Sequence, residues 1–294
     1  MVFRADDEYH RNARKIPLIM IITFQADGLS DMIRGVKLNF LVEDTVNPEN
    51  PDLWPEHGLS ILIEVEYGDG NRGKILFDTG TSGKALEHNV RLMDVSLRDV
   101  TSIVLSHGHY DHTGGLLAAL NEIKPFLPIP IVAHPDALRR KFALKPYLRF
   151  TGIPFTEYEI ESRGGRFMVS SKPLEVVEDV FSTGEVERTT GFEKSPEYYV
   201  MLKNGEIVRD YMLDDQAVVI KQAGKGLVVV TGCAHAGVVN TARYARKFTG
   251  EEKVHAVIGG FHLIGASAER IEKTVEELKK INPDLIAPCH CTGE

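Results

Sequence analysis

The sequence has little cysteine and no long apolar segment. Only three cysteines occur among 294 residues, and such a small, odd number does not indicate a framework of disulfides. We therefore expect a reducing compartment, the cytoplasm. The longest apolar run near the N-terminus covers residues 16–24, far short of the roughly 20 residues that a membrane-spanning helix needs. The charged residues before it lack the apolar core of a secretion signal, so we expect no membrane association.

An excess of positive charge is also missing. The net charge is −8 and no basic stripe is visible, which weighs against a nucleic-acid partner. A hydrophobic fraction of 43% and a charged fraction of 26% are ordinary for a globular protein and exclude a fibre or a disordered chain. We interpret residues 1–294 as a single domain that acts on a small molecule. A homo-oligomer stays an open alternative.

The chain alternates apolar strands with short helices. Two hairpins are indicated by apolar runs around glycine-rich turns, and isolated apolar runs indicate buried strands. Two β-rich halves, each followed by helices, favour two sheets packed face to face with helices outside. The hairpins are expected at 60–80 and 216–232, further strands at 16–24, 101–107, 129–134, 253–260 and 285–290, and helices at 84–94, 115–123, 238–248 and 267–280.

Residues 135–212 differ in character from the rest. They are rich in proline, glycine and charge, with short strand-like pieces, and we interpret them as an insertion or a substrate-pocket region. A basic cluster lies near their start. It is either a solvated helix face or a grip for a phosphate or carboxylate. Its members are Arg139, Arg140, Lys141, Lys145 and Arg149.

The densest chemical signal is the segment SHGHYDHTGG at residues 106–115. Three imidazoles and one carboxylate fall within six residues, directly after a predicted buried strand. Nitrogen and carboxylate oxygen are donors that zinc-type ions favour, and four such groups would be costly to bury without partners. His107 and His109 are placed to reach one ion, and Asp111 and His112 a second.

Three more histidines stand at predicted strand ends, where they can join the same site. We expect His235 and His290 to bind metal, and His262 to be a ligand, a group that supports a ligand, or a substrate contact. Cys233 is either a soft ligand or buried packing, and we favour packing. Cys289 and Cys291 should alternate away from His290 on a strand, which also predicts packing.

HGHYDHTGG resembles the HxHxDH signature of the metallo-β-lactamase superfamily. Segments 56–66, 75–80, 231–241, 259–263 and 288–293 are similar to the branch that includes a methanopterin-pathway synthase. The resemblance implies an α+β fold, a four-layer αββα sandwich. It also implies that Asp78 supports the metal loop without binding an ion. One ion would be held by His107, His109 and His235, and the other by Asp111, His112 and His290.

Two departures from the family pattern bear on the metal site. No aspartate stands at the end of LVVVTGC, where many relatives have a bridging one, and Cys233 takes roughly that place. The usual histidine ahead of this hairpin is replaced by Asp214-Asp215-Gln216, which makes Asp215 an alternative ligand. We therefore expect one or two divalent ions. Zinc is favoured, and magnesium, manganese and iron suit the same donors.

The resemblance implies a metal-dependent transferase. It would join a dihydropterin-methyl diphosphate to ribofuranosylaminobenzene 5′-phosphate and release pyrophosphate. Asp111 and His262 would be catalytic, and Arg139, Arg140, Lys145 and His262 would contact the phosphorylated substrate. The alternatives are a metallohydrolase of a phosphodiester, ester or lactone, which shares the same site, and a metal-stabilised binding module without turnover.

Overall fold

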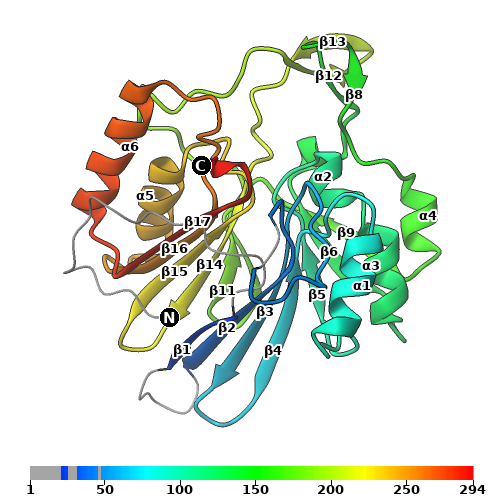
Figure 1. Ribbon diagram of the computed structural model, residues 1–294, viewed down its shortest axis with the longest axis vertical. Helices are drawn as coiled ribbons and strands as arrows, with labels where there is room; N and C mark the ends of the chain where they lie inside the picture. The colour runs from blue at the N-terminus through cyan, green and yellow to red at the C-terminus, as the bar shows by residue number, and fades with distance from the viewer. Residues whose placement is uncertain (1–20, 26–31, 46–47, 294) are drawn as a thin grey trace.

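A computed structural model describes residues 21–25, 32–45 and 48–293. Its strands form a large folded sheet whose two halves face each other, with helices on both outer sides (Figure 1). The predicted four-layer αββα sandwich is thereby confirmed. The predicted strand at 16–24 lies largely outside the described residues, and strand β1 spans Ile21–Gln25.

The first half of the sheet is built mainly from the N-terminal part of the chain. Its order is β2-β3-β4-β5-β6-β9, with β1 paired to β2. Helices α1, α3 and α4 lie on its outer face (Figure 1). The strands are β2 (Ile33–Val42), β3 (Ser60–Tyr67), β4 (Arg72–Phe77), β5 (Ser102–Val104), β6 (Ile129–Ala133) and β9 (Gly165–Val169), and the helices are α1 (Lys84–Leu92), α2 (Tyr110–Thr113), α3 (Leu116–Ile123) and α4 (Glu157–Glu161).

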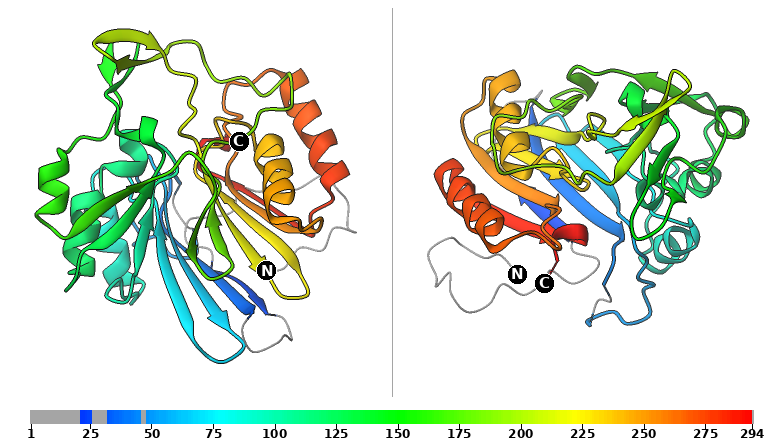
Figure 2. Two further views of the ribbon diagram at one scale, coloured as in Figure 1. Left: turned by 180° about the vertical axis from the view of Figure 1, so that it is seen from behind. Right: turned by 90° about the horizontal axis from the view of Figure 1, so that it is seen from above.

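The second half is built from the C-terminal part and meets the first where β14 pairs with β2. Helices α5 and α6 cover its outer face, on the opposite side of the molecule from α1 and α3 (Figure 2). The strands are β14 (Ala217–Gln222), β15 (Gly226–Thr231), β16 (Val254–Gly260) and β17 (Leu285–Cys289), with β11 (Val180–Ser182) beside β14 and β10 (Leu174–Val177) beside β11, and the helices are α5 (Val238–Thr249) and α6 (Ala268–Ile281).

Three apolar layers separate the four structural layers. The central one joins side chains of both halves, such as Ile61 and Val104 with Val228 and Ile258. A second lies between the first half and α1 and α3, and the third lies between the second half and α5 and α6. Burial of apolar area drives this arrangement, and it leaves the loops at the strand ends free for polar residues.

A small separate sheet stands at one end of the sandwich (Figure 1). Its order is β13-β12-β7-β8, and its strands are β7 (Lys141–Ala143), β8 (Arg149–Phe150), β12 (Tyr199–Lys203) and β13 (Glu206–Arg209). The segment 135–212 thus contributes to both sheets, because β9, β10 and β11 join the large one.

Candidate metal centre

The segment that carries the HxHxDH pattern leaves strand β5 and runs through the short helix α2. Asp78, which follows β4, holds this segment in place through hydrogen bonds. Its carboxylate accepts hydrogen bonds from the Ser106 amide at 2.7 Å and the Ser106 hydroxyl at 2.6 Å, and it lies 2.6 Å from His112 Nδ1. The Nε2 atom of His112 is thereby left to face the site. This is the supporting role that the family resemblance implied for Asp78.

Glycine is required at position 108 by a close approach of two backbones. A Cβ atom there would lie 2.2 Å from the carbonyl oxygen of Ala137, well inside van der Waals contact. The Gly108 amide donates to Asp214 Oδ2 at 2.8 Å. His107 and His109 on either side are held with their nitrogens facing, since His107 Nε2 lies 3.0 Å from His109 Nδ1.

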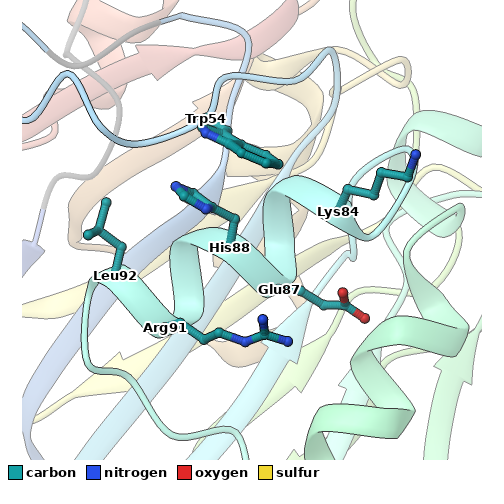
Figure 3. A pocket seen from close by; sticks show the side chains of 6 residues that line it. All are labelled: Trp54, Lys84, Glu87, His88, Arg91 and Leu92. Atoms are coloured by element: carbon teal, nitrogen blue, oxygen red, sulfur yellow. The ribbon is translucent and has the colours of Figure 1, made fainter.

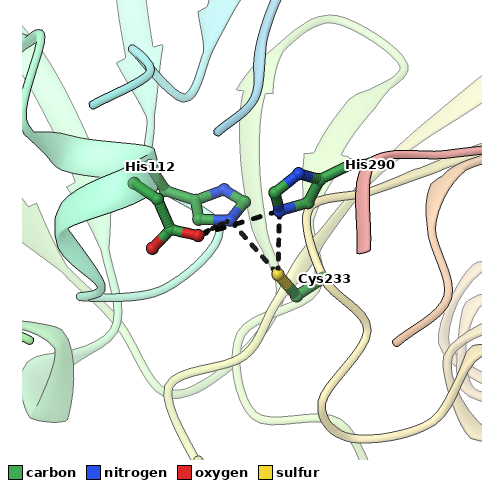
Figure 4. Close-up of side chains that lie close together, drawn as sticks. His112, Cys233 and His290 are labelled. Atoms are coloured by element: carbon green, nitrogen blue, oxygen red, sulfur yellow. Dashed lines mark hydrogen bonds and ion pairs between the residues drawn. The ribbon is translucent and has the colours of Figure 1, made fainter. Parts of the chain in front are cut away.

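Four donors come together around the sulfur of Cys233. Asp111, His112, Cys233 and His290 each offer one atom, and these atoms all lie within 4.8 Å of one another. Cys233 Sγ is 3.2 Å from His112 Nε2 and 3.4 Å from His290 Nε2, and Figure 4 shows both rings turned toward the sulfur. A sulfur and a nitrogen bound to one tetrahedral zinc ion lie about 3.6 Å apart, so these separations are within a few tenths of an ångström of those at a shared ion.

A second group contains His107, Cys233 and His235, again within 4.8 Å. The ring of His235 lies 4.9 Å from that of His107 and 5.3 Å from that of His109. The structure therefore places His235 and His290 beside the dense segment, and metal binding by them stays a prediction. His109, which was also predicted to be a ligand, is in neither of these two donor groups. Its position beside them rests on the 3.0 Å separation between His109 Nδ1 and His107 Nε2.

Cys233 and Cys291 are buried, as the packing role favoured from the sequence requires, and they also lie among possible metal donors. Cys233 belongs to three donor groups, and Cys291 forms one of them with Cys233 and His262. Cys291 lies beside the donors because the backbone leaves the strand conformation: His290 has a φ of 49° and begins the 3₁₀ helix His290–Thr292. The alternation of a strand therefore ends before Cys291. Cys289 is part of the central apolar layer, as predicted.

Unpartnered buried nitrogens test whether these residues suit a metal ion. Among the described residues, both ring nitrogens of His235 and Nε2 of His109 are buried without a hydrogen-bond partner. Such groups are rare because they forfeit the hydrogen bonds that water supplied. A divalent cation would provide the missing partner, so the donor set fits the ion that the family implies.

Protonation agrees with this fit. Burial lowers the pKa of His109 to about 3 and holds the pKa values of His107 and His235 well below their usual range, so the three rings are neutral, as ligands must be. Burial acts in the same direction on His112, but the charges of Asp78 and Asp111 outweigh it and raise its pKa to about 9. A cation in place of the proton would satisfy the same two carboxylates.

Three side chains that surround the donors were not identified as site residues from the sequence. Asp44, after β2, lies 2.9 Å from His290 Nδ1 and 3.2 Å from His57 Nδ1. His57 Nε2 lies 3.5 Å from Asp111 Oδ2 while much of its ring is exposed, so it stands at the mouth of the site. The Tyr199 ring lies 4.8 Å from that of His109. A position just beyond a strand end was a readable signal for Asp44, whereas nothing local marked the other two.

The basic cluster divides between two environments. Lys141 is buried and bonds Asp210 at 2.5 Å and Asp214 at 2.9 Å. Arg139 pairs with Asp136, and the Arg140 guanidinium lies over the Phe142 ring. Lys145 is exposed. The interpretation of this segment as a solvated helix face is therefore wrong, because Lys141 is buried and begins strand β7.

The structure also shows where the other residues predicted as ligands or substrate contacts lie. Asp215 accepts from the Ala236 amide at 2.9 Å and belongs to no donor group among the described residues. The side chains of Arg139, Arg140 and Lys145 make no hydrogen bond or ring contact with the donors within the part of the chain that is described. The ring of His262 lies 4.2 Å from that of His235.

A surface pocket lies apart from these donors. It is lined by Trp54 and by residues along α1, and the Trp54 ring stacks on His88 at 4.0 Å (Figure 3). No donor residue lines it. In the described ranges, no helix is long and apolar enough to cross a membrane.

Comparison with known proteins gives a consistent result. Residues 53–196 match the family model described as the metallo-β-lactamase superfamily. The chain is 39% identical to the 7,8-dihydropterin-6-methyl-4-(β-D-ribofuranosyl)-aminobenzene-5′-phosphate synthase of Methanocaldococcus jannaschii over 89% of each chain. It is 31% identical to an uncharacterized protein of the same organism, over 87% of this chain and 90% of that one.

A solved structure is also similar over most of its length. It is the crystal structure of a metal-dependent hydrolase of the β-lactamase superfamily, which is 29% identical and has a TM-score of 0.71. The match covers 88% of this chain and 89% of that one.

Proposed function

Because this chain belongs to the metallo-β-lactamase superfamily, we propose that it is a metal-dependent synthase that joins a dihydropterin-methyl diphosphate to ribofuranosylaminobenzene 5′-phosphate and releases pyrophosphate. The proposal is carried by one combination. A donor cluster with unpartnered buried nitrogens occurs in a chain that is 39% identical, over 89% of its length, to a synthase of this product.

We assign the ions to the residues that the pattern indicated. His107, His109 and His235 would hold one, and Asp111, His112 and His290 the other, with zinc favoured by the nitrogen-rich set. A bound divalent ion supplies charge that stabilises the departing diphosphate oxygens.

The chain's own groups fix the orientation of the site. Asp78 holds the His112 ring through Nδ1, and Asp44 holds the His290 ring through Nδ1. Both rings therefore present Nε2 to the interior. In the proposed reaction the amine nitrogen of the aminobenzene would form a bond to the pterin methyl carbon as the bond between that carbon and the diphosphate oxygen breaks. Asp111 Oδ2 lies 3.5 Å from His112 Nε2 and 3.5 Å from His57 Nε2, so the carboxylate can take up the proton that the amine loses and pass it to the exposed His57 ring.

The phosphate contacts are proposed on the small sheet and the turn before it. Arg139, Arg140 and Lys145 carry positive charge near strand β7, whose sheet also contributes Tyr199 against His109. Lys145 and Arg140 are exposed and therefore available to a phosphorylated substrate. A guanidinium or ammonium group forms charge-assisted hydrogen bonds with phosphate oxygens.

The assay combines the purified protein with both substrates and zinc or magnesium and measures pyrophosphate. We expect release that depends on both substrates and is lost in His109→Ala. His88→Ala, on the surface of α1, is the matched control and should keep the wild-type rate. Absence of pyrophosphate from metal-loaded protein would contradict the synthase proposal.

A metallohydrolase is the second candidate, because the solved structure with a TM-score of 0.71 is described as a metal-dependent hydrolase. The same metal groups would serve hydrolysis, with Asp111 orienting the attacking water. Cleavage of a phosphodiester, ester or lactone by protein that fails the pyrophosphate assay would favour this candidate.

A further inference from the structure

Three loops from the second half of the sheet bring two thiols and an imidazole together beside the proposed centre. Cys233 follows β15, His262 follows β16, and Cys291 follows β17. Their ligand atoms all lie within 4.8 Å of one another. Cys233 and Cys291 are buried and His262 is half-buried. The two ions assigned from the family pattern use none of these three residues, although Cys233 stands roughly where many relatives have a bridging aspartate.

Backbone hydrogen bonds between the loops fix this grouping. The Gly260 amide donates to Gly232 O at 3.0 Å, and the Ile264 amide donates to Cys291 O at 3.2 Å. The Phe261 amide donates to Thr292 Oγ1 at 3.0 Å. These bonds hold both cysteine loops against the segment that carries His262, so the donors converge through the backbone.

The packing around the thiols leaves little freedom. A Cβ atom at Gly260 would lie 2.3 Å from Gly232 O and 2.9 Å from Cys291 Sγ. The sulfur of Cys291 therefore occupies the space that a larger residue at position 260 would take. This close approach keeps the sulfur of Cys291 near the backbone of Cys233, whose carbonyl it contacts at 3.6 Å.

His262 supplies a second, independent sign of a ligand. Its Nδ1 atom is buried and has no hydrogen-bond partner among the described residues. Its backbone φ is 46°, a left-handed conformation that is uncommon for residues other than glycine, although histidine adopts it more often than most, and that occurs frequently at ligand sites. A half-buried imidazole that has one buried, unpartnered nitrogen and lies beside two thiols is poorly explained by packing alone.

We propose that Cys233, His262 and Cys291 form a third metal-binding group, a Cys₂His site for a zinc-type ion, next to the histidine and aspartate donors. Two sulfurs and one nitrogen form a donor set that zinc accepts in sites that keep a fourth position open. The sulfur of Cys233 has lone pairs enough to be shared with a neighbouring ion. The neighbouring ion is the one of the proposed metal centre, so this assignment rests on the proposed function. It replaces the catalytic and substrate-binding roles predicted for His262.

The donor chemistry predicts metal selectivity. Thiolates favour zinc and cobalt strongly over magnesium, whereas a site of imidazoles and carboxylates alone discriminates less. Magnesium should therefore fail to displace zinc or cobalt from this group.

Cobalt(II) loaded into the full-length protein is the probe, because each cobalt–thiolate bond adds near-ultraviolet charge-transfer absorption. We expect this band in the wild-type protein and the loss of about half of it in Cys291→Ser, since one of two thiolates is removed. His262→Ala should weaken cobalt binding while leaving both thiols. Cys289→Ser is the matched control, because Cys289 packs in the central layer two residues from Cys291, and its band should equal that of the wild type.

An unchanged band and unchanged cobalt stoichiometry in both Cys291→Ser and His262→Ala would overturn the third group. That failure is distinct from failure of the proposed function. If Cys291→Ser loses part of the charge-transfer band while the wild-type protein releases no pyrophosphate, the third group stands and the synthase proposal falls. If the wild type releases pyrophosphate while Cys291→Ser and His262→Ala keep the full band and the full cobalt content, the synthase proposal stands and the third group falls.

Discussion

Lys141 and two aspartates connect the small sheet to the metal loop through buried charges. The ammonium of Lys141 bonds Asp210 and Asp214, and Asp214 also accepts from the Gly108 amide between His107 and His109. All three side chains are almost fully buried. Removal of one partner would leave uncompensated charge in the interior.

Lys141→Met is expected to lower the free energy of unfolding by about 3–5 kcal/mol, the usual cost of breaking a buried ion pair. Urea unfolding measures the change. Lys145→Met is the matched control, since an exposed lysine should change stability by no more than about 0.5 kcal/mol. A loss below about 1 kcal/mol for Lys141→Met would show that the buried charges are not held by this lysine.

Tyr67 predicts how stability depends on alkaline pH. Burial, with nearby Glu178 and Asp179 adding to it, raises the pKa of Tyr67 to about 12, and its hydroxyl donates to Glu178 O at 2.8 Å. The unfolded pKa is about 10, so between these values the folded state binds more protons than the unfolded state. Stability should therefore fall as pH rises from about 10 to about 12, by roughly 3 kcal/mol in total.

Tyr67→Phe removes this titrating group and should flatten the alkaline decline over that window. Urea unfolding of both proteins at a series of alkaline pH values provides the comparison. Equal slopes for the two proteins would refute the assignment to Tyr67.

At the scale of elements, helix α6 shows what local sequence can predict. Ser267 caps it, with its side chain accepting from the Arg270 amide, and Asn282 ends it in a left-handed conformation. The sequence predicted residues 267–280 for this helix, because caps and charge placement are local signals. Its buried face includes Thr274, Leu278 and Ile281.

Ser267→Ala should lower the free energy of unfolding by about 1 kcal/mol, since the Arg270 amide loses its acceptor. Ser267→Thr keeps a hydroxyl and should lose much less. Thermal or urea unfolding separates the two variants. Equal stability of Ser267→Ala and the wild type would mean that the cap contributes nothing.

The pairing of the small sheet could not be predicted from the sequence. One of the strand-like pieces expected within 135–212 is β12, but β7 is short and has no periodicity that identifies it. The two strands pair so that Lys141 lies opposite Met201, and this pairing depends on contacts that local patterns do not contain. Helix α4 was missed although Thr156 and Glu159 form a readable capping box.

At the scale of the whole molecule, the dense segment from His107 to His112 could be predicted as one side of a site, because its donors are adjacent in sequence. The other side required the fold. The position of Cys291 among the donors was not predicted, because the alternation of a strand was extended past His290, where the backbone turns. Cys233 was identified as a possible soft ligand, with packing favoured. His57 and Tyr199 reach the donors from a loop and from the small sheet, and nothing in their local sequence indicated it.

The central claim is that this cluster of imidazoles and carboxylates binds a divalent ion, and metal content measures it most directly. Wild-type protein dialysed against zinc and then against metal-free buffer should retain at least one ion per chain, and His107→Ala with His109→Ala should retain fewer. Wild-type protein that keeps no zinc above the buffer, or a double variant that keeps as much as the wild type, would contradict the account.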